Sequence, residues 1–583
     1  MSRSRAPSKP DRSLSGGFNR AMILRLGLAV VWLPGFALWF YSFGLPNNRP
    51  AERWMIWSRI PFDLMDLLDP PVIDGSAPWS WFYLADRLPF FGLALLVWVT
   101  SVCLGRTELR VLRLWTCFDR MERLFFAACL GLASTSLLVL GLGLAGIVQG
   151  GALLLIVLGI CGVELQKTWR ERRLPGDRRP SVSKPSGAVP SFLESEPANV
   201  GLLWIRRGVV WTLVPFVFCL LLGAMSPQTD FDVVEYHLGG PKEWFLMGRI
   251  SRLPHNVYTS FPFLTEMLIL SGMELSGDWY WGALAGQAII AGFAPLTAVG
   301  LLATGKRWFS PAAGWLAALV WLTTPWAYRI SIIAYAEGGL ACYLFAAFAV
   351  GLRSIWDHPS ARENPEEHSV GDRIPITMYG LCGFLAGSAM ACKYTGLISA
   401  VLPVGVMLFG SLVAALQKTP RASGSPGQAA GNERSVFAAM SAYSVGVLVA
   451  IGPWMAKNLM ETGNPVFPLA YSLFGGEGRD AAMDYQWRMA HSSHYDSIWA
   501  ILVDFPVKLT DVVANNDWHS ALMFGLAPIA ILANWRRKIW FIWAFVGWVT
   551  GMPLIQIPKC RPRITIVFTK NSLSFGTTFR VGW

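Results

Sequence analysis

Long apolar runs separated by charged loops are the feature that most constrains the fold of this chain. Only 15% of its 583 residues are charged, whereas a soluble protein carries about 25%. This pattern predicts an all-α, polytopic membrane protein with about thirteen transmembrane helices. It excludes a soluble enzyme, a secreted disulfide scaffold and a disordered chain. The predicted segments lie near 26–44, 88–105, 124–147, 150–165, 208–225, 280–303, 311–327, 336–352, 378–392, 396–416, 436–455, 520–534 and 539–557.

The charges of the loops predict how the chain is oriented. The formal net charge is +12, and the chain begins with a basic, polar tail. If this tail is cytoplasmic, the loops on the same side hold about 30 of the 49 lysines and arginines, and 22 of the 37 acidic residues lie on the other side. This asymmetry follows the positive-inside rule. We therefore expect a cytoplasmic N-terminus, and the basic charge gives no reason to expect nucleic-acid binding.

Composition divides the chain into four predicted parts. Residues 1–165 form an N-terminal four-helix membrane region, and 166–207, rich in proline, serine and arginine, form a basic cytoplasmic linker. Residues 208–557 form the membrane core, whose outside loops include 226–279 and 456–518. The tail 558–583 has five basic and no acidic residues, which is atypical for a membrane span.

Two glycine patterns imitate nucleotide-binding motifs. Gly141, Gly143 and Gly146 have the GxGxxG spacing, but an apolar membrane segment surrounds them and no strand precedes them. Gly300, Gly305 and Lys306 resemble a P-loop, but Arg307 replaces the required Ser or Thr. We expect the GxGxxG glycines to allow close packing of helices. We expect Lys306 and Arg307 to be ordinary charges that flank a membrane helix.

An acidic cluster opens the first outside loop of the core. Asp230, Asp232, Glu235, Tyr236 and His237 directly follow an apolar segment. On a helix starting here, Asp232, Glu235 and Tyr236 share a face. Carboxylates that repel one another have raised pKa values, which suits a general base. The alternative is a solvated acidic helix start.

Other ionisable residues lie at the outside ends of later segments. Glu337 opens an apolar segment after a short turn that carries Arg329, and Lys393 lies in a tight turn between two apolar runs. Ionisable residues in such places are functional by default, with snorkelling to the interface as the alternative.

A third segment, GPWMAKNLMETGNPVFPL, contains Lys457, Asn458 and Asn464. A capped helix end followed by a Gly-Asn-Pro turn explains it equally well.

These segments together resemble the GT-C superfamily of membrane glycosyltransferases, in the bacterial protein-mannosyltransferase and aminoarabinose-transferase-like branch. The resemblance covers about residues 205–470. It rests on five motifs in the family's order: DFDVVEYHL, SFPFLTEM, AYAE, KYTGL and PWMAKN…TGNPVFP. It implies a GT-C-like helical core in the bacterial inner membrane.

The family catalyses inverting transfer of a sugar from a polyprenyl-phosphate donor to a lipid, glycan or protein acceptor on the non-cytoplasmic side. The resemblance makes Asp232 the general base, with Asp230 or Glu235 assisting. Asp230 and Asp232 are also the place where a divalent cation, magnesium or manganese, would bind. No other cofactor or metal is expected.

The same resemblance gives the other residues binding roles. Lys393 is the leading candidate to stabilise the departing phosphate, and Glu337 would orient an amine or cation. His237 is either a partner of Asp232 or a packing residue. The remaining donor or substrate candidates are Tyr236, Arg249, Arg252, Arg329, Lys457, Asn458 and Asn464.

Two other functions fit the sequence. A membrane transporter or lipid-linked sugar flippase would use Glu337 and Lys393 as intramembrane gates. A non-catalytic assembly subunit becomes the better interpretation if the atypical tail 558–583 disables the site.

Overall fold

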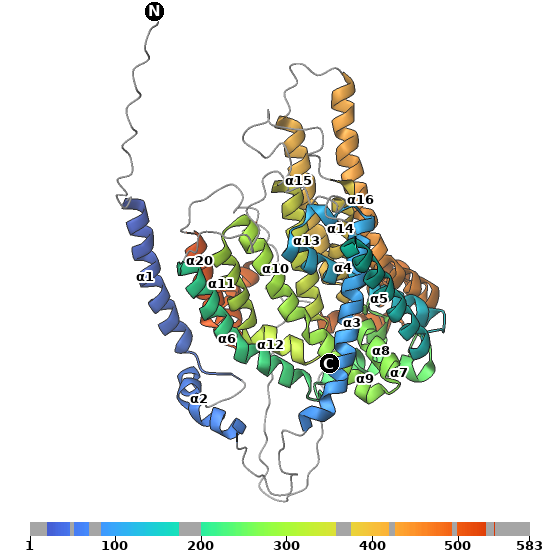
Figure 1. Cartoon of the computed structure of the whole chain (residues 1–583), viewed down its shortest axis with the longest axis horizontal. Coiled ribbons are helices and arrows are strands. Elements are labelled where there is room, and N and C mark those ends of the chain that lie inside the picture. The colour runs from blue at the N-terminus through green and yellow to red at the C-terminus, as the bar shows by residue number, and fades with distance from the viewer. Residues whose placement is uncertain are drawn as a thin grey trace, which may run out of the picture. The chain divides into compact units, whose positions relative to one another are not determined.

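The computed structural model describes residues 20–46, 52–68, 83–173, 200–356, 375–418, 426–491, 498–531 and 542 (Figure 1). These residues are helical with connecting loops, and none of them forms a strand. The chain forms two compact units. One contains residues 1–71 and 510–540, and the other contains 72–509 and 541–583. The domain boundaries at 165 and 207 stay a prediction.

The larger unit carries most of the helices. Their bounds, in chain order, are α3 (Tyr83–Val111), α4 (Arg120–Leu144), α5 (Gly150–Arg173), α6 (Val200–Ala224), α7 (Gly239–Met247), α8 (Leu264–Ser276), α9 (Trp279–Ala291), α10 (Phe293–Trp308), α11 (Pro311–Leu322), α12 (Pro325–Ile332), α13 (Glu337–Trp356), α14 (Ile376–Cys392), α15 (Leu402–Lys418), α16 (Pro426–Thr462), α17 (Tyr471–Phe474) and α18 (Ala481–His491). Helix α19 (Ile498–Val513) begins in this unit and ends in the other.

Eight helices of the described residues are long and apolar enough to cross a membrane. They are Ala85–Val111, Arg120–Leu144, Gly150–Arg170, Val200–Ala224, Trp279–Trp308, Glu337–Trp356, Leu397–Gln417 and Ser435–Thr462. Three shorter apolar helices, Leu26–Tyr41, Pro311–Leu322 and Ile376–Cys392, coincide with further predicted segments. The chain is thus a helical, multi-pass membrane protein.

The last two predicted spans have different outcomes. The segment near 520–534 contains α20 (Ala521–Ile531), which has 11 residues, and the segment near 539–557 lies outside the described residues except for Ile542. The number of thirteen spans stays a prediction. The tail 558–583 and linker residues 174–199 also lie outside the described residues.

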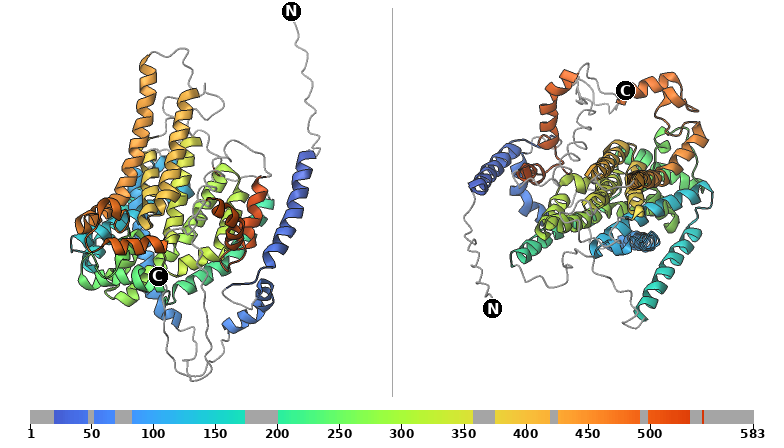
Figure 2. Two further views of the ribbon diagram at one scale, coloured as in Figure 1. Left: turned by 180° about the vertical axis from the view of Figure 1, so that it is seen from behind. Right: turned by 90° about the horizontal axis from the view of Figure 1, so that it is seen from above.

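Glycines bring several helices of the larger unit into backbone contact. A Cβ atom on Gly131 of α4 would lie 1.6 Å from the carbonyl oxygen of Ser101 in α3. A Cβ atom on Gly446 of α16 would lie 2.2 Å from the carbonyl oxygen of Gly380 in α14. Membrane helices approach closely through small residues, because apolar lipid gives no hydrophobic drive for their association. In Figure 2, the N-terminal part of the long helix α16 (orange) projects past its neighbours.

The GxGxxG pattern in α4 has another role than the predicted packing of helices. A Cβ atom on Gly143 would lie 2.4 Å from the side chain of Ile250, which belongs to the loop after α7, and Gly141 has nothing within 4 Å. Gly146 has a φ of +70° just after the helix end, a conformation that glycine adopts without strain. The pattern therefore marks the end of α4, and Gly143 leaves space for Ile250 of the loop after α7. By contrast, Gly305 packs against Gly314 of α11.

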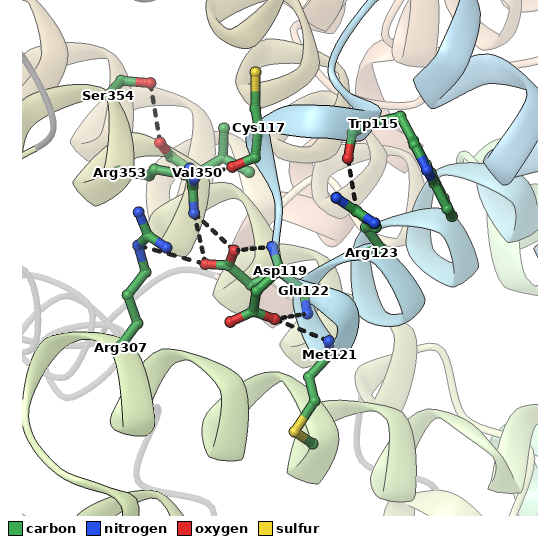
Figure 3. Close-up of polar contacts among 10 residues, drawn as sticks. All are labelled: Trp115, Cys117, Asp119, Met121, Glu122, Arg123, Arg307, Val350, Arg353 and Ser354. Carbon is green, nitrogen blue, oxygen red and sulfur yellow. Dashed lines mark hydrogen bonds and ion pairs between the residues drawn. The ribbon is translucent and has the colours of Figure 1, made fainter. Parts of the chain in front are cut away.

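A buried ion network joins three helices at one end of the larger unit (Figure 3). Asp119 and Glu122 form a capping box at the start of α4. The Arg353 guanidinium at the end of α13 donates to both oxygens of Glu122 at 2.7 Å and to the carbonyl of Cys117. Arg307 at the end of α10 lies 3.6 Å from the same carboxylate. The network unites three loops that the sequence predicts on one side of the membrane.

The smaller unit contains α1 (Arg20–Tyr41), α2 (Arg53–Leu68), the end of α19 and α20. The indole of Trp32 donates to the carbonyl of Gly525 at 2.8 Å, which fixes α1 against α20. The Arg53 guanidinium donates to the carbonyls of Phe40 and Phe43 and lies over the Phe40 ring. The first predicted membrane segment therefore associates with a helix near the other end of the chain.

The two ends of the larger unit differ in what they contain (Figure 1). One end holds the Glu122 network and the start of α16. The other holds the short helices α7, α8 and α12, together with the C-terminal end of α14. The predicted site residues belong to this second end.

Candidate functional site

Two glutamines hold the loop that carries Asp230. Gln287 of α9 is fully buried, and its amide donates to the carbonyls of Ala224 and Ser226 at 3.1 and 2.8 Å. Helix ends leave carbonyls without helical partners, so this side chain satisfies the end of α6. Gln228 donates to the carbonyl of Ile332 at 2.9 Å. The loop is therefore tied to the end of α12.

Asp230 is held by two side chains that lie about a hundred residues further along the chain. The Arg329 guanidinium is 2.6 Å from one carboxylate oxygen, and the Tyr335 hydroxyl donates to the other at 2.7 Å. Burial, followed by the hydrogen bond to Asp230 and its charge, raises the pKa of Tyr335, so that hydroxyl stays a donor. Arg329 lies within α12 and not in the predicted turn.

The turn between α12 and α13 directs Tyr335 towards Asp230. Ala334 has a φ of +56°, which is uncommon for a residue with a side chain. Glu337, two residues after Tyr335, is the first residue of α13. This strained turn therefore delivers a hydroxyl and a carboxylate to the same place, as strained backbones at functional sites often do.

The segment after Asp230 is helical, but with another geometry than predicted. Val233–His237 is a five-residue π-helical turn (η3), in which the amide of Leu238 donates to the carbonyl of Val233 at 2.8 Å. The prediction that Asp232, Glu235 and Tyr236 share a face assumed the spacing of an α-helix. It does not apply directly to a π-helical turn. Such π-helical turns are rare in proteins, and those that occur often lie at functional sites.

Asp232 is exposed, and within the described part of the chain it has neither an ion-pair partner nor a hydrogen-bond partner. Burial and the Asp232 charge raise the pKa of the neighbouring Glu235. The charges of Asp232 and Glu337 also raise the pKa values of both Tyr236 and Tyr335, after the larger effect of burial. The charges of Asp232 and Glu337 therefore act on the same pair of tyrosines.

Lys393 and Glu337 form an ion pair at the site. The ammonium lies 2.7 Å from one carboxylate oxygen, and the side chains are 47% and 28% exposed. Lys393 directly follows α14 in an extended conformation, and the turn closes through the amide of Gly396. The two sequence-predicted residues thus meet, and the exposed ammonium remains accessible to an anion.

His237 faces a buried carboxylate. Its Nδ1 atom lies 2.5 Å from Glu266, and both side chains are buried. The other oxygen of Glu266 accepts from the Thr265 hydroxyl at 3.0 Å. The ring of His237 also lies 5.5 Å from that of Tyr335. Of the two predicted roles, the contacts support packing and positioning, because the described partner of His237 is Glu266 and not Asp232.

Asn458 joins several of the sequence motifs. Its amide is buried and donates to the carbonyl of Ser260 at 2.8 Å and to the hydroxyl of Tyr394 at 3.3 Å. It also lies 3.5 Å from the carbonyl of Phe467. The segments around SFPF, KYTGL and NPVFP are therefore held together by one side chain of α16.

The other predicted residues lie apart from this cluster. Lys457 is buried and pairs with Glu461 at 2.7 Å, and Arg252 donates to the carbonyl of Glu477 at 2.5 Å. Arg249 is exposed. Asn464 is buried and donates to the carbonyls of Leu469 and Gly475, so it holds the turn as the alternative interpretation proposed.

Metal ligands are sparse at the site. The residues that the structure describes contain no group of three or more His, Cys, Asp or Glu side chains arranged around a metal position. Both oxygens of Asp230 already accept from Arg329 and Tyr335. A cation at Asp230 and Asp232 would therefore have to displace Arg329, and it stays a prediction. A cavity of about 520 Å³ lies elsewhere, where α5 begins and α8 ends.

Several residues of the cluster escaped the sequence analysis. Tyr335 lies in the motif AYAE, Glu266 in SFPFLTEM and Tyr394 in KYTGL, so their motifs were recognised but the residues were not singled out. The signal present for Glu266 was a glutamate within the apolar stretch FLTEMLIL. Gln287 lies in an apolar run and gave a similar, weaker signal.

Comparisons with protein-family models, with curated proteins and with solved structures found no match for this chain. The resemblance to GT-C glycosyltransferases therefore rests on the five motifs, and its functional content is a proposal.

Proposed function

We propose that the chain is an inverting membrane glycosyltransferase of the GT-C type, acting on the non-cytoplasmic side of the bacterial inner membrane. It takes a sugar from a polyprenyl-phosphate donor and transfers it to an acceptor hydroxyl. The observation that carries the proposal is the Lys393–Glu337 ion pair, together with the exposed carboxylate of Asp232, whose charge, like that of Glu337, helps to raise the pKa values of Tyr236 and Tyr335.

The reaction needs one proton acceptor and one anion-stabilising group. The acceptor oxygen attacks the anomeric carbon as the bond from that carbon to the phosphate oxygen breaks, and the electron pair leaves with the phosphate. The Asp232 carboxylate takes the proton of the acceptor hydroxyl. Its exposure and lack of a described partner leave both oxygens available. One displacement inverts the anomeric configuration, and phosphate needs no acid to protonate it, unlike the leaving group of a glycoside hydrolase.

Lys393 would stabilise the phosphate as negative charge develops on it. The ammonium now pairs with Glu337, and a phosphate with greater charge can compete for it. Arg329 is a weaker candidate, because Asp230 already accepts from its guanidinium. The cluster lies at helix ends, so the prenyl chain of the donor can stay in the hydrocarbon.

The positions of the ionisable residues favour a transferase over a transporter. Glu337 is the first residue of α13 and Lys393 follows the last residue of α14. A transporter gate is expected nearer the bilayer midplane, beside interrupted helices. The pair at the helix ends is better suited to a substrate that approaches along the membrane surface.

An assay in proteoliposomes distinguishes the two functions. The full chain is reconstituted with a polyprenyl-phosphate donor carrying a radiolabelled sugar, and label is measured both on acceptor molecules and in the lumen. We expect label on the acceptor in wild type and a loss of about 100-fold in Lys393→Gln. The control is Lys242→Gln, which removes a cation that lies over the Trp279 ring. Accumulation in the lumen without transfer would establish the transporter instead.

A further inference from the structure

A row of aromatic rings extends from Tyr236, in the segment of the proposed base, to Tyr394, which follows Lys393. Tyr236 stacks on Tyr258 with ring centroids 4.9 Å apart. Tyr258 lies 5.7 Å from Trp487, and Trp487 lies 6.1 Å from Phe261. Phe261 in turn lies 5.6 Å from Tyr394. We call these five residues the aromatic row.

The aromatic row is continuous with the proposed site. Tyr236 belongs to the same helical segment as Asp232, and the charges of Glu235 and Asp232 contribute, after burial, to the raised pKa of Tyr258. At its other end, Tyr394 directly follows Lys393. All five rings are only half-buried. A row that begins beside a proton acceptor and keeps part of each ring accessible can hold the molecule that gives up the proton.

Trp487 is held in place by a charged framework. Asp484, buried in α18, accepts from Arg488 at 2.9 Å and lies 3.5 Å from Arg479. The Arg479 guanidinium lies 5.3 Å from the centre of the Trp487 ring. The ring is therefore fixed in the middle of the row, beside the largely buried Arg479 guanidinium.

We propose that the aromatic row is an acceptor subsite that binds the pyranose ring of a carbohydrate. This proposal rests on the proposed function and names its acceptor class, a glycan and not a protein hydroxyl. A pyranose has an apolar C–H face that stacks on aromatic rings and a rim of hydroxyls that needs polar partners. Tyrosine and tryptophan supply both an apolar body and a polar group.

An isoprenoid chain fits the same surface less well. The row consists of loop and short-helix residues outside the candidate membrane spans, whereas the prenyl chain of a donor stays in hydrocarbon. Burying a chain without hydrogen-bonding groups against these tyrosines would leave hydroxyl groups without partners. The chemistry of the row therefore favours a sugar.

Saturation-transfer NMR on the full chain in nanodiscs tests the proposal with methyl glucoside, methyl galactoside and methyl mannoside as probes. We expect saturation on the ring C–H protons of at least one glycoside and a loss of at least about threefold in Trp487→Ala. Trp487→Phe keeps a ring and should retain most of the transfer. The matched control is Tyr485→Ala on the same helix, an exposed residue outside the row, which should leave saturation unchanged.

Three results would overturn the proposal: saturation that persists in Trp487→Ala, stronger saturation of a serine-containing peptide, or stronger saturation of farnesyl phosphate. The variant Asp232→Asn separates this proposal from the proposed function. It should bind the glycosides as wild type does while losing transfer. If the wild type transfers sugar but its glycoside binding does not depend on the aromatic row, only the subsite proposal is contradicted. If glycosides bind through the row but the wild type transfers no sugar, only the proposed transferase function is contradicted.

Discussion

Asp230 and Asp232 lie two residues apart and have different surroundings. Both oxygens of Asp230 are engaged, by Arg329 and by Tyr335, whereas Asp232 is exposed and has no partner in the described ranges. A carboxylate with both oxygens engaged positions the backbone, and one with open oxygens can accept a proton. The structure therefore supports different roles for two residues that the sequence presents as one cluster.

We expect Arg329→Gln to reduce transfer by about tenfold to a hundredfold, because loss of the clamp displaces the loop that carries Asp232. The pair is partly exposed, so it contributes about 0–1 kcal/mol to folding, and the thermal midpoint should change little. The measurement is transfer activity beside a melting curve. The exposed Arg120, the first residue of α4, provides the control through Arg120→Gln, which should match wild type. A large fall in the melting temperature with proportional loss of activity would make Arg329 merely structural.

Residue types at the candidate site were partly predictable. Asp230, Asp232, Glu337 and Lys393 are ionisable residues at the ends of apolar runs, and this context alone marks them. The contact between Asp230 and Tyr335 joins positions 105 residues apart, and nothing in either local segment specifies it. Such pairings depend on tertiary packing. The partners of the predicted residues could therefore be identified only from the structure.

At the scale of elements, glycines fix how the helices that carry the site approach one another. Helix α14 ends just before Lys393, and α16 carries Asn458. The two helices cross where Gly446 faces Gly380. Apolar runs predicted both helices. They did not predict the division of 280–303 at Gly292 or of 311–327 before Pro325, because uniformly apolar sequence has no periodicity that marks a break.

The variant Gly446→Val should destabilise the crossing of α14 and α16 by about 1–3 kcal/mol or more, because its Cβ would overlap a backbone oxygen that cannot move alone. Transfer activity should fall with it, since both helices carry site residues. Thermal unfolding of the solubilised protein measures the effect. Gly452→Val lies on the same helix with nothing within 4 Å and should unfold like wild type. Equal stability of the two variants would refute the close crossing.

At the scale of the whole molecule, the larger unit has two ends with separate tasks. The Glu122–Arg353 network (Figure 3) locks the end formed by loops rich in basic residues. The proposed chemistry lies at the other end. The distribution of charges along the sequence predicts the same separation as an alternation of loops. Which end faces the cytoplasm stays a prediction of the positive-inside rule.

Cysteine labelling in intact bacteria tests that orientation. We expect Glu477→Cys, in the loop before α18, to react with a membrane-impermeant maleimide above the wild-type background. Thr116→Cys, an exposed position in the turn before α4, should react only after the membrane is permeabilised. The reverse pattern would place the proposed site on the cytoplasmic side.

The most direct test of the central claim is the rate of sugar transfer by Asp232→Asn in membranes supplied with a lipid-linked sugar. Loss of a general base lowers the rate by about 10²–10⁴-fold, and we predict a fall in this range with normal expression and folding. The matched control is Asp278→Asn, which changes the acid that caps α9 to a residue that caps as well and should keep wild-type activity. Full transfer by Asp232→Asn would contradict the account.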